Sequence, residues 1–286
     1  MNTENMSAQA EQLLLQVKKS PAAVAVHDKS AWMDIFAKYH VVEDPVGSTP
    51  HVGGGYDAAE GQRGHGALSR FFDTYIAPNT ITFEVAQDLV CGNHVVRDLN
   101  IHIQMSPTVS ATVPMHLLYE LVDENGTWKI VRLAAHWELL PMVMQLLGKG
   151  MGAVSVLSAL TVRMVKLQGL GGVLGFSKAA LNIGSRGKTA LQTFVDACNQ
   201  QNLAMLMSVM QHDNAVIHWP YGTATVSASE LFAQLQGKLS ISKLLAAGDC
   251  VTATVSCEQA GVVKQGVLIA EFNKKTKKMS ALRAYF

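Results

Sequence analysis

The stretch HVVRDLNIHI, residues 94–103, decides the fold because its apolar and polar residues alternate. Val95 and Leu99 fall on one face of an extended chain, and Asp98 falls on the other. The same period of two runs through Thr80–Glu138, as half-buried antiparallel strands require. A hairpin signal, DENG, joins the last two of these predicted strands.

Helical patterns precede the strands. Residues 8–17 and 22–39 are predicted as two helices, separated at Pro21 because proline disrupts a helix interior. In the second, the spacing of Trp32, Phe36 and Tyr39 is typical of one buried helical face. Residues 48–66, rich in Gly and Pro, are expected to form a long loop. Helices followed by an antiparallel meander predict an α+β fold, with helices on one face of a curved sheet.

Charge and composition exclude several function classes. Lys+Arg 23 against Asp+Glu 22 leave a net charge of +1, so the basic footprint of a nucleic-acid-binding protein is absent from the sequence. Charged residues make up only 16% of the 286 residues, against about 25% in ordinary soluble domains. A surface short of charge indicates an interface, a lipophilic pocket or membrane contact.

No cofactor or metal is predicted. The four cysteines form no C-x-x-C pair, the ten histidines show no metal-ligand spacing, and Gly53-Gly54-Gly55 precedes no G-K-[S/T]. The first residues, MNTENMSAQAEQ, contain no apolar segment of the kind that targets a chain for secretion. We therefore expect a cytoplasmic protein.

Residues 139–187 differ from the rest, because they contain no acidic residue and are dominated by Gly, Leu, Met and Val. No transmembrane span is predicted, since Lys149, Arg163, Lys166 and Lys178 interrupt the apolar run. One interpretation is a linker of amphipathic helices between two domains. The other is a segment that contacts a membrane surface or another subunit.

Residues 188–286 repeat the pattern of residues 1–138. VVEDPVG at 41–47 matches VIHWPYG at 216–222, and RLAAHW at 132–137 resembles ALRAYF at 281–286. Two matches in the same order predict a tandem duplication.

Three motifs carry a family resemblance: VVEDPVG (41–47), GHGALSRFFDTYIAPN (64–79) and RLAAHWE (132–138). They resemble the steroid Δ-isomerases and SnoaL-like proteins of the NTF2-like superfamily, which have a cone-shaped α+β fold. The resemblance covers about residues 8–138 and implies two NTF2-like domains, 1–138 and 188–286, joined by the apolar helical linker.

The resemblance implies that Asp44 is a general base. In ketosteroid isomerases, a worked example of pKa tuning, the corresponding aspartate moves a proton next to a carbonyl, and a Tyr and a protonated Asp donate to the oxyanion. Val42 supplies an apolar neighbour that raises the basicity of the carboxylate. Local sequence alone favours a turn aspartate before Pro45, and the family resemblance favours a functional carboxylate.

The other family positions differ. The oxyanion tyrosine falls near Ser20, two supporting tyrosines fall at Phe36 and Phe72, and the oxyanion acid falls at Leu118. Asp98 or His116 is the expected substitute donor, provided that their strand faces look into the cone. Otherwise they belong to an ordinary polar outer face of the sheet.

The predicted site therefore has Asp44, His116 and Asp98 as catalytic residues, and a substrate pocket of Trp32, Phe36, Val42, Phe72, Leu118 and Trp137. Trp137 is read equally well as a core residue. In the second copy Trp219 takes the base position, and an indole cannot abstract a proton. That copy is expected to be a structural partner or a separate apolar pocket.

The leading hypothesis is a protein that binds a lipophilic, carbonyl-bearing small molecule, steroid-like or polyketide-like, and shifts a proton with Asp44. The alternatives are a non-catalytic binding protein and an interaction module of the same fold. The two domains are expected to pair as an intrachain pseudo-dimer, or chains to pair as a homo-oligomer.

Overall fold

The computed structural model describes residues 3–54, 56–57, 62–63, 66–211, 215–235, 237–259 and 261–286. The chain divides into two compact units. The first consists of Met1–Asp88 and Asn93–Ala180, and the second of Leu89–Gly92 and Leu181–Phe286. Both combine helices with a sheet, so the predicted α+β class is confirmed.

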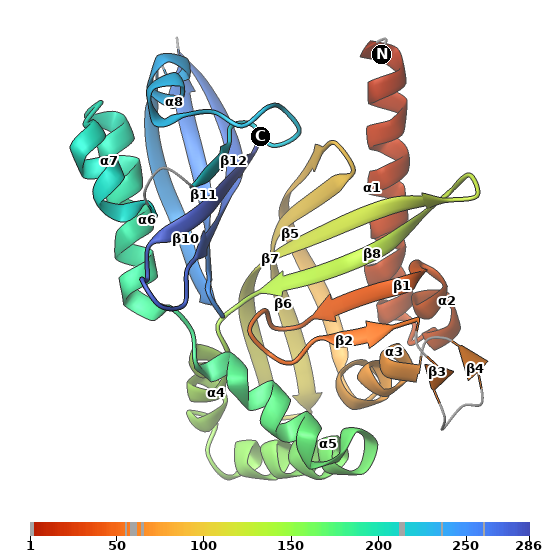
Figure 1. Cartoon of the computed structure of the whole chain (residues 1–286). Coiled ribbons are helices and arrows are strands. Elements are labelled where there is room, and N and C mark those ends of the chain that lie inside the picture. Colours follow the sequence, from red (N-terminus) through yellow and green to blue (C-terminus); the bar gives the residue numbers. More distant parts are fainter. Residues whose placement is uncertain are drawn as a thin grey trace. The chain divides into compact units, whose positions relative to one another are not determined.

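The first unit is built on a curved six-stranded sheet in the order β2-β1-β8-β7-β6-β5 (Figure 1). Strands β6, β7 and β8 pair antiparallel, as their alternation predicts, whereas β1 pairs parallel to β8. The turn between β7 and β8 has positive φ at Asn125 and Gly126, as a tight hairpin requires. The strands are β1 (Phe36–Glu43), β2 (His51–Gly53), β5 (Thr80–Cys91), β6 (His94–Ser106), β7 (Val109–Glu124) and β8 (Thr127–His136).

Helices close the concave side of this sheet. Helix α1 (Thr3–Ala25) buries Leu13, Val17 and Val24 along one face, and it packs against β6 and β8. The short α2 (Lys29–Asp34) begins at Asp28, whose side chain accepts from the amide of Ala31 at 2.9 Å. Helix α3 (Gly66–Phe71) continues into the π-helix η1 (Phe72–Ile76).

Three local predictions need correction. Helix α1 continues through Pro21 instead of ending there. Phe36 and Tyr39 lie in strand β1, which pairs with β8 through Phe36 and Ile130 and again from Val41 onward. Sheet pairing overrides the helical spacing of these aromatic residues. The expected loop at 48–66 contains β2 and a short hairpin of β3 (Tyr56–Asp57) and β4 (Gln62–Arg63). Residues 55, 58–61 and 64–65 of that stretch lie outside the described residues.

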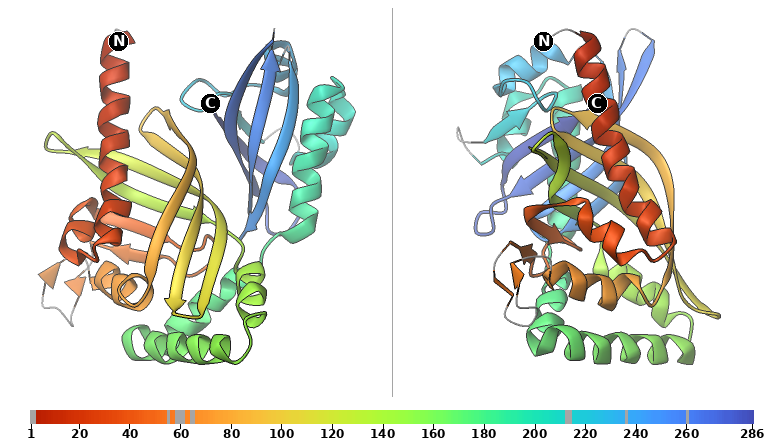
Figure 2. Two further views of the ribbon diagram at one scale, coloured as in Figure 1. Left: turned by 180° about the vertical axis from the view of Figure 1, so that it is seen from behind. Right: turned by 90° about the vertical axis from the view of Figure 1, so that its right-hand side faces the viewer.

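Most of the predicted linker belongs to the first unit. Helix α4 (Leu139–Leu147), helix α5 (Met151–Ser177) and the 3-10 turn η2 (Lys178–Ala180) lie at one end of its sheet (Figure 2). Helix α5 is kinked at Gly169, where φ is 69°. By length and composition alone, Met151–Ala180 is long and apolar enough to cross a membrane. Its contacts with η1 and β7 make it part of the first unit's wall.

The second unit has a five-stranded sheet in the order β10-β11-β12-β13-β9, in which β9 pairs parallel to β13 and the other neighbours are antiparallel. Its strands are β9 (Val216–His218), β10 (Lys238–Ala247), β11 (Cys250–Gln259), β12 (Val262–Phe272) and β13 (Met279–Tyr285). Its helices are α6 (Gly184–Asn199), α7 (Leu203–Val209) and α8 (Ala228–Gln234). Trp219 is 7% exposed and packs with Phe286 in this unit's core, with ring centroids 5.3 Å apart.

Candidate functional site

A cavity lies inside the first unit, between the concave face of the sheet and the surrounding helices. Its empty space amounts to about 1000 Å³, including open solvent at its mouth. Apolar and aromatic side chains form most of its wall. Its lining includes Val24, Trp32, Val42, Phe71, Ile101, Ile103, Val113, Met115, Leu117, Leu133, Met142, Leu160 and Phe176.

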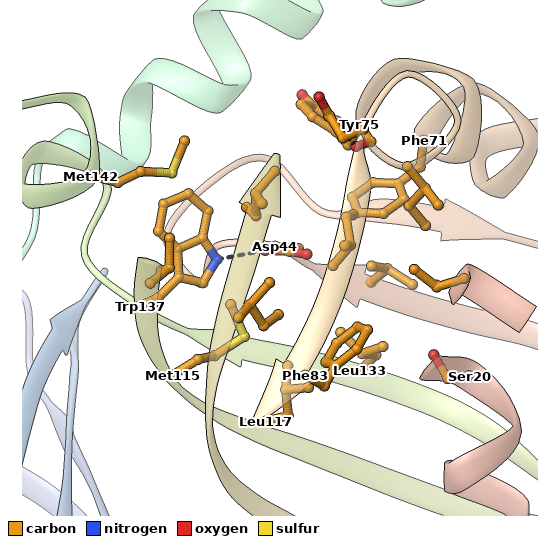
Figure 3. A pocket seen from close by; sticks show the side chains of 18 of the residues that line it. Ser20, Asp44, Phe71, Tyr75, Phe83, Met115, Leu117, Leu133, Trp137 and Met142 are labelled. Carbon is orange, nitrogen blue, oxygen red and sulfur yellow. Dashed lines mark hydrogen bonds between the residues drawn. The ribbon is translucent and has the colours of Figure 1, made fainter. Parts of the chain in front are cut away.

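Asp44 supplies a carboxyl group to this cavity (Figure 3). It follows β1 directly, and strand alternation places it on the same side as Val42, which also lines the cavity. Its partly accessible surface therefore belongs to a cavity-lining side chain and not to an exposed bend.

Trp137 holds the carboxylate in place. Its Nε1 donates a hydrogen bond of 2.6 Å to Asp44 Oδ1, from the residue that directly follows β8. Burial raises the pKa of Asp44 from 3.8 to about 6, and the indole hydrogen bond opposes this rise without cancelling it. Because burial disfavours the charged form, the carboxyl group titrates close to neutral pH.

Two phenols share the cavity with Asp44 and were missed in the sequence. Tyr75 comes from η1 and Tyr119 from β7. Burial raises the pKa of Tyr75, with a further contribution from the charge of Asp44, and a hydrogen bond with Gln168 opposes the rise. Burial also raises the pKa of Tyr119, against the opposing effects of Arg97 and Ser20. Both hydroxyls are therefore protonated donors at neutral pH.

Ser20 and Arg97 are the polar neighbours of Tyr119. Ser20 at the end of α1 lines the cavity and accepts from Trp32 Nε1 at 3.2 Å. The Arg97 guanidinium, which is almost fully buried, donates to Asp88 Oδ1 at 2.7 Å. The tyrosine thus has a cation and a hydroxyl as neighbours, which favour negative charge at its oxygen.

Asp98 and His116 lie on the opposite face of the sheet from the cavity lining. They are directly paired across β6 and β7, and the cavity is lined by the alternate residues Met115, Leu117 and Tyr119. His116 Nε2 lies 3.6 Å from Asp98 Oδ1, and both side chains are buried. This corrects the expectation that either residue faces the cone. Alternation shows which residues share a face but not which face is concave.

The predicted pocket residues divide into two groups. Trp32, Val42 and Trp137 line the cavity. Phe36 and Phe72 do not; they pack behind Trp32, with ring centroids 4.9 and 5.7 Å away. Leu118 is buried on the same sheet face as His116, because residues two apart on β7 share a face and the cavity is on the other one.

Some of the cavity residues that the sequence did not reveal come from the helices that follow the sheet. Met142, Leu160 and Phe176 reach the cavity from α4 and α5, and Phe176 stacks on Tyr75 at 5.6 Å. The absence of acids and the abundance of Gly, Leu, Met and Val distinguished residues 139–187 in the sequence, but they did not point to the cavity. Within the described residues, no group of three His, Cys, Asp or Glu side chains is arranged to hold a metal ion.

No protein-family model and no curated protein matches the chain. Solved structures do match. A Δ5-3-ketosteroid isomerase from Mycobacterium sp. is 26% identical and covers 44% of this chain and 92% of its own, with a TM-score of 0.36. A Mycobacterium tuberculosis protein in complex with estradiol-17β-hemisuccinate is 25% identical, covering 46% and 96%, with a TM-score of 0.37. An LEH-like epoxide hydrolase from M. tuberculosis is 14% identical, covering 52% and 98%, with a TM-score of 0.39.

The structural neighbours of this chain are NTF2-like. The three sequence motifs predict the same superfamily. Each of these NTF2-like neighbours matches about half of this chain and nearly all of its own length.

Proposed function

We propose that the first unit binds a lipophilic small molecule bearing a carbonyl group, of steroid-like or polyketide-like size, and that Asp44 shifts a proton on it. The observation that carries the proposal is the Asp44 carboxyl group in an apolar cavity, with its pKa raised to about 6. At pH 7 a group with this pKa is mostly ionised and is more basic than an ordinary carboxylate, which suits a general base.

The reaction also needs donors for the enolate oxygen that forms when the proton leaves. Tyr119 and Tyr75 are the candidates, because both line the cavity and the charge of Asp44 affects the pKa of both. Tyr119 is the stronger candidate since Arg97 lies beside it. The base would remove the proton next to the carbonyl and return it to another carbon, while a phenol stabilises the negative oxygen.

The second unit is proposed to be a diverged copy of the first. Its short strand pairs parallel to its last strand, as β1 does with β8. The amide of Val46 donates to Ala135 O at 2.9 Å, and the amide of Tyr221 donates to Ala284 O at 2.7 Å. These bonds occupy corresponding places in the two repeated motifs, which supports a duplication.

This correspondence places Trp219 where the first unit has Asp44. Trp219 cannot take a proton, and it is buried in the core of its own unit. We therefore propose that the second unit has a structural role and carries no proton-transfer site.

The test is turnover of an unconjugated enone steroid, followed by the absorbance of its conjugated product, in wild type and Asp44→Asn. A probe-displacement assay measures binding to both proteins. We expect wild type to bind and isomerise, and Asp44→Asn to bind without isomerising. Binding by both proteins with no turnover across a panel of such enones would leave a non-catalytic binding protein. No binding by either protein would refute the proposed ligand class.

A further inference from the structure

The α4–α5 segment has an apolar face that nothing in the first unit covers. Helix α5 turns Ala153, Leu160 and Met164 toward the unit, yet its opposite side is also apolar. Surface helices normally place polar residues there. The exposed large side chains of the segment are Leu140, Met144, Leu147, Met151, Val154, Val162, Val165, Leu170 and Leu174.

The charged residues within α4, α5 and the turns that follow each of them are all basic. Lys149, Lys166 and Lys178 are exposed, and Arg163 is half-buried. No acidic residue occurs anywhere in residues 139–187, although the whole chain is nearly neutral. Exposed apolar side chains surrounded by cations match the composition of segments that lie in the interface of anionic membranes.

We infer that α4 and α5 dock this protein on an anionic lipid surface, lying in the interface plane. Charge complementarity favours lipid over a second copy of the chain, because two such faces would bring cations against cations. The sequence of α5 also favours a position in the membrane interface over one that spans the bilayer. Lys166 would lie within the span, and Gly169 breaks the helix at that level.

The inner side of the segment supports the same orientation. Arg163 donates to Thr74 O at 3.0 Å, and Gln168 donates to Thr74 Oγ1 at 2.9 Å. The amide of Thr49 donates to Gly175 O at 3.0 Å. These bonds hold α5 on the first unit, so its outer face can contact lipid while the fold stays intact.

Docking would place the ligand cavity beside the bilayer. Met142, Leu160 and Phe176 extend from the same two helices into the cavity wall. A sparingly soluble ligand could then exchange between lipid and cavity without crossing bulk water. This consequence rests on the proposed binding function, whereas docking itself does not.

Sedimentation with vesicles tests the docking without any ligand. The full-length protein is mixed with phosphatidylcholine vesicles, or with vesicles containing 30% phosphatidylglycerol. We expect binding to the anionic vesicles, weaker binding to the neutral ones, and release by high salt. Each lysine near an anionic surface contributes a factor of about five, so Lys149→Gln/Lys166→Gln/Lys178→Gln should bind on the order of 100-fold more weakly.

The apolar contribution is tested with Leu170→Ser/Leu174→Ser, which should lose vesicle binding. Val26→Ser/Val262→Ser is the matched control, because these side chains are similarly exposed elsewhere. Lys274→Gln/Lys275→Gln/Lys277→Gln is the charge control. Thermal melts confirm that each variant is folded.

Three results would overturn the inference. Wild type could remain in the supernatant with anionic vesicles. The control variants could lose as much binding as the test variants. Size-exclusion chromatography with light scattering could show a dimer that Leu170→Ser/Leu174→Ser dissociates, with no vesicle binding by wild type.

Discussion

The hydrogen bond from Trp137 to Asp44 allows a direct test of the site's electrostatics. In Trp137→Phe the aromatic packing is largely retained, but the 2.6 Å hydrogen bond to the carboxylate is lost. A hydrogen bond to a charged group stabilises it by about 1.5–3 kcal/mol, and about 1.4 kcal/mol corresponds to one pKa unit. The pKa of Asp44 should therefore rise from about 6 to between about 7 and 8.

The assay is an NMR titration of the Asp44 side-chain carboxyl carbon, assigned by comparison with Asp44→Asn. Trp32→Phe is the matched control, because Trp32 also lines the cavity but donates to Ser20 at 3.2 Å. In Trp32→Phe the pKa of Asp44 should stay near the wild-type value. A Trp137→Phe protein whose Asp44 pKa is unchanged or lower would refute the hydrogen bond's role in keeping the carboxylate ionised.

Three further predictions concern stability, space and chemistry. Burial raises the pKa of Asp44 above its unfolded value, so the free energy of unfolding of wild type falls as pH rises from about 4 to 6. Urea titrations should therefore give Asp44→Asn a free energy of unfolding on the order of 1–3 kcal/mol above that of wild type at pH 8, and no such gain at pH 4. Met142→Trp places a larger side chain in the cavity wall, so it should weaken steroid-probe binding at least about tenfold and lower the free energy of unfolding by about 1–3 kcal/mol. A probe affinity equal to that of wild type would show that the probe binds outside this cavity. Tyr119→Phe should reduce turnover by about 10²–10³ with little change in probe affinity, so an unchanged kcat would remove Tyr119 as the oxyanion donor.

The sequence was most informative where one periodicity dominated. Alternation from Thr80 to Glu138 predicted the strands that became β5 to β8, because a half-buried sheet has a period of two. The E-D-P-x-G resemblance pointed to Asp44, and the structure places that residue in the cavity.

Sequence reasoning failed where the outcome depended on tertiary packing. The spacing of Trp32, Phe36 and Tyr39 fits a helix, but Phe36 and Tyr39 belong to β1, which pairs with β8. His116 and Tyr119 lie on opposite faces of β7, and only the curvature of the sheet shows which face encloses the cavity. The side of α5 that lines the cavity is also not encoded in its periodicity, because this helix is apolar all round.

Hydrogen exchange at a bound ketone tests the role of Asp44 most directly. A saturated 3-ketosteroid cannot isomerise, but a general base in the cavity will exchange the protons next to its carbonyl with solvent deuterium, which NMR detects. We expect wild type to catalyse this exchange, and Asp44→Asn to bind the ketone with exchange at the uncatalysed rate. Equal exchange by the two proteins, or none by wild type with the ketone bound, would contradict the assignment of Asp44 as the base.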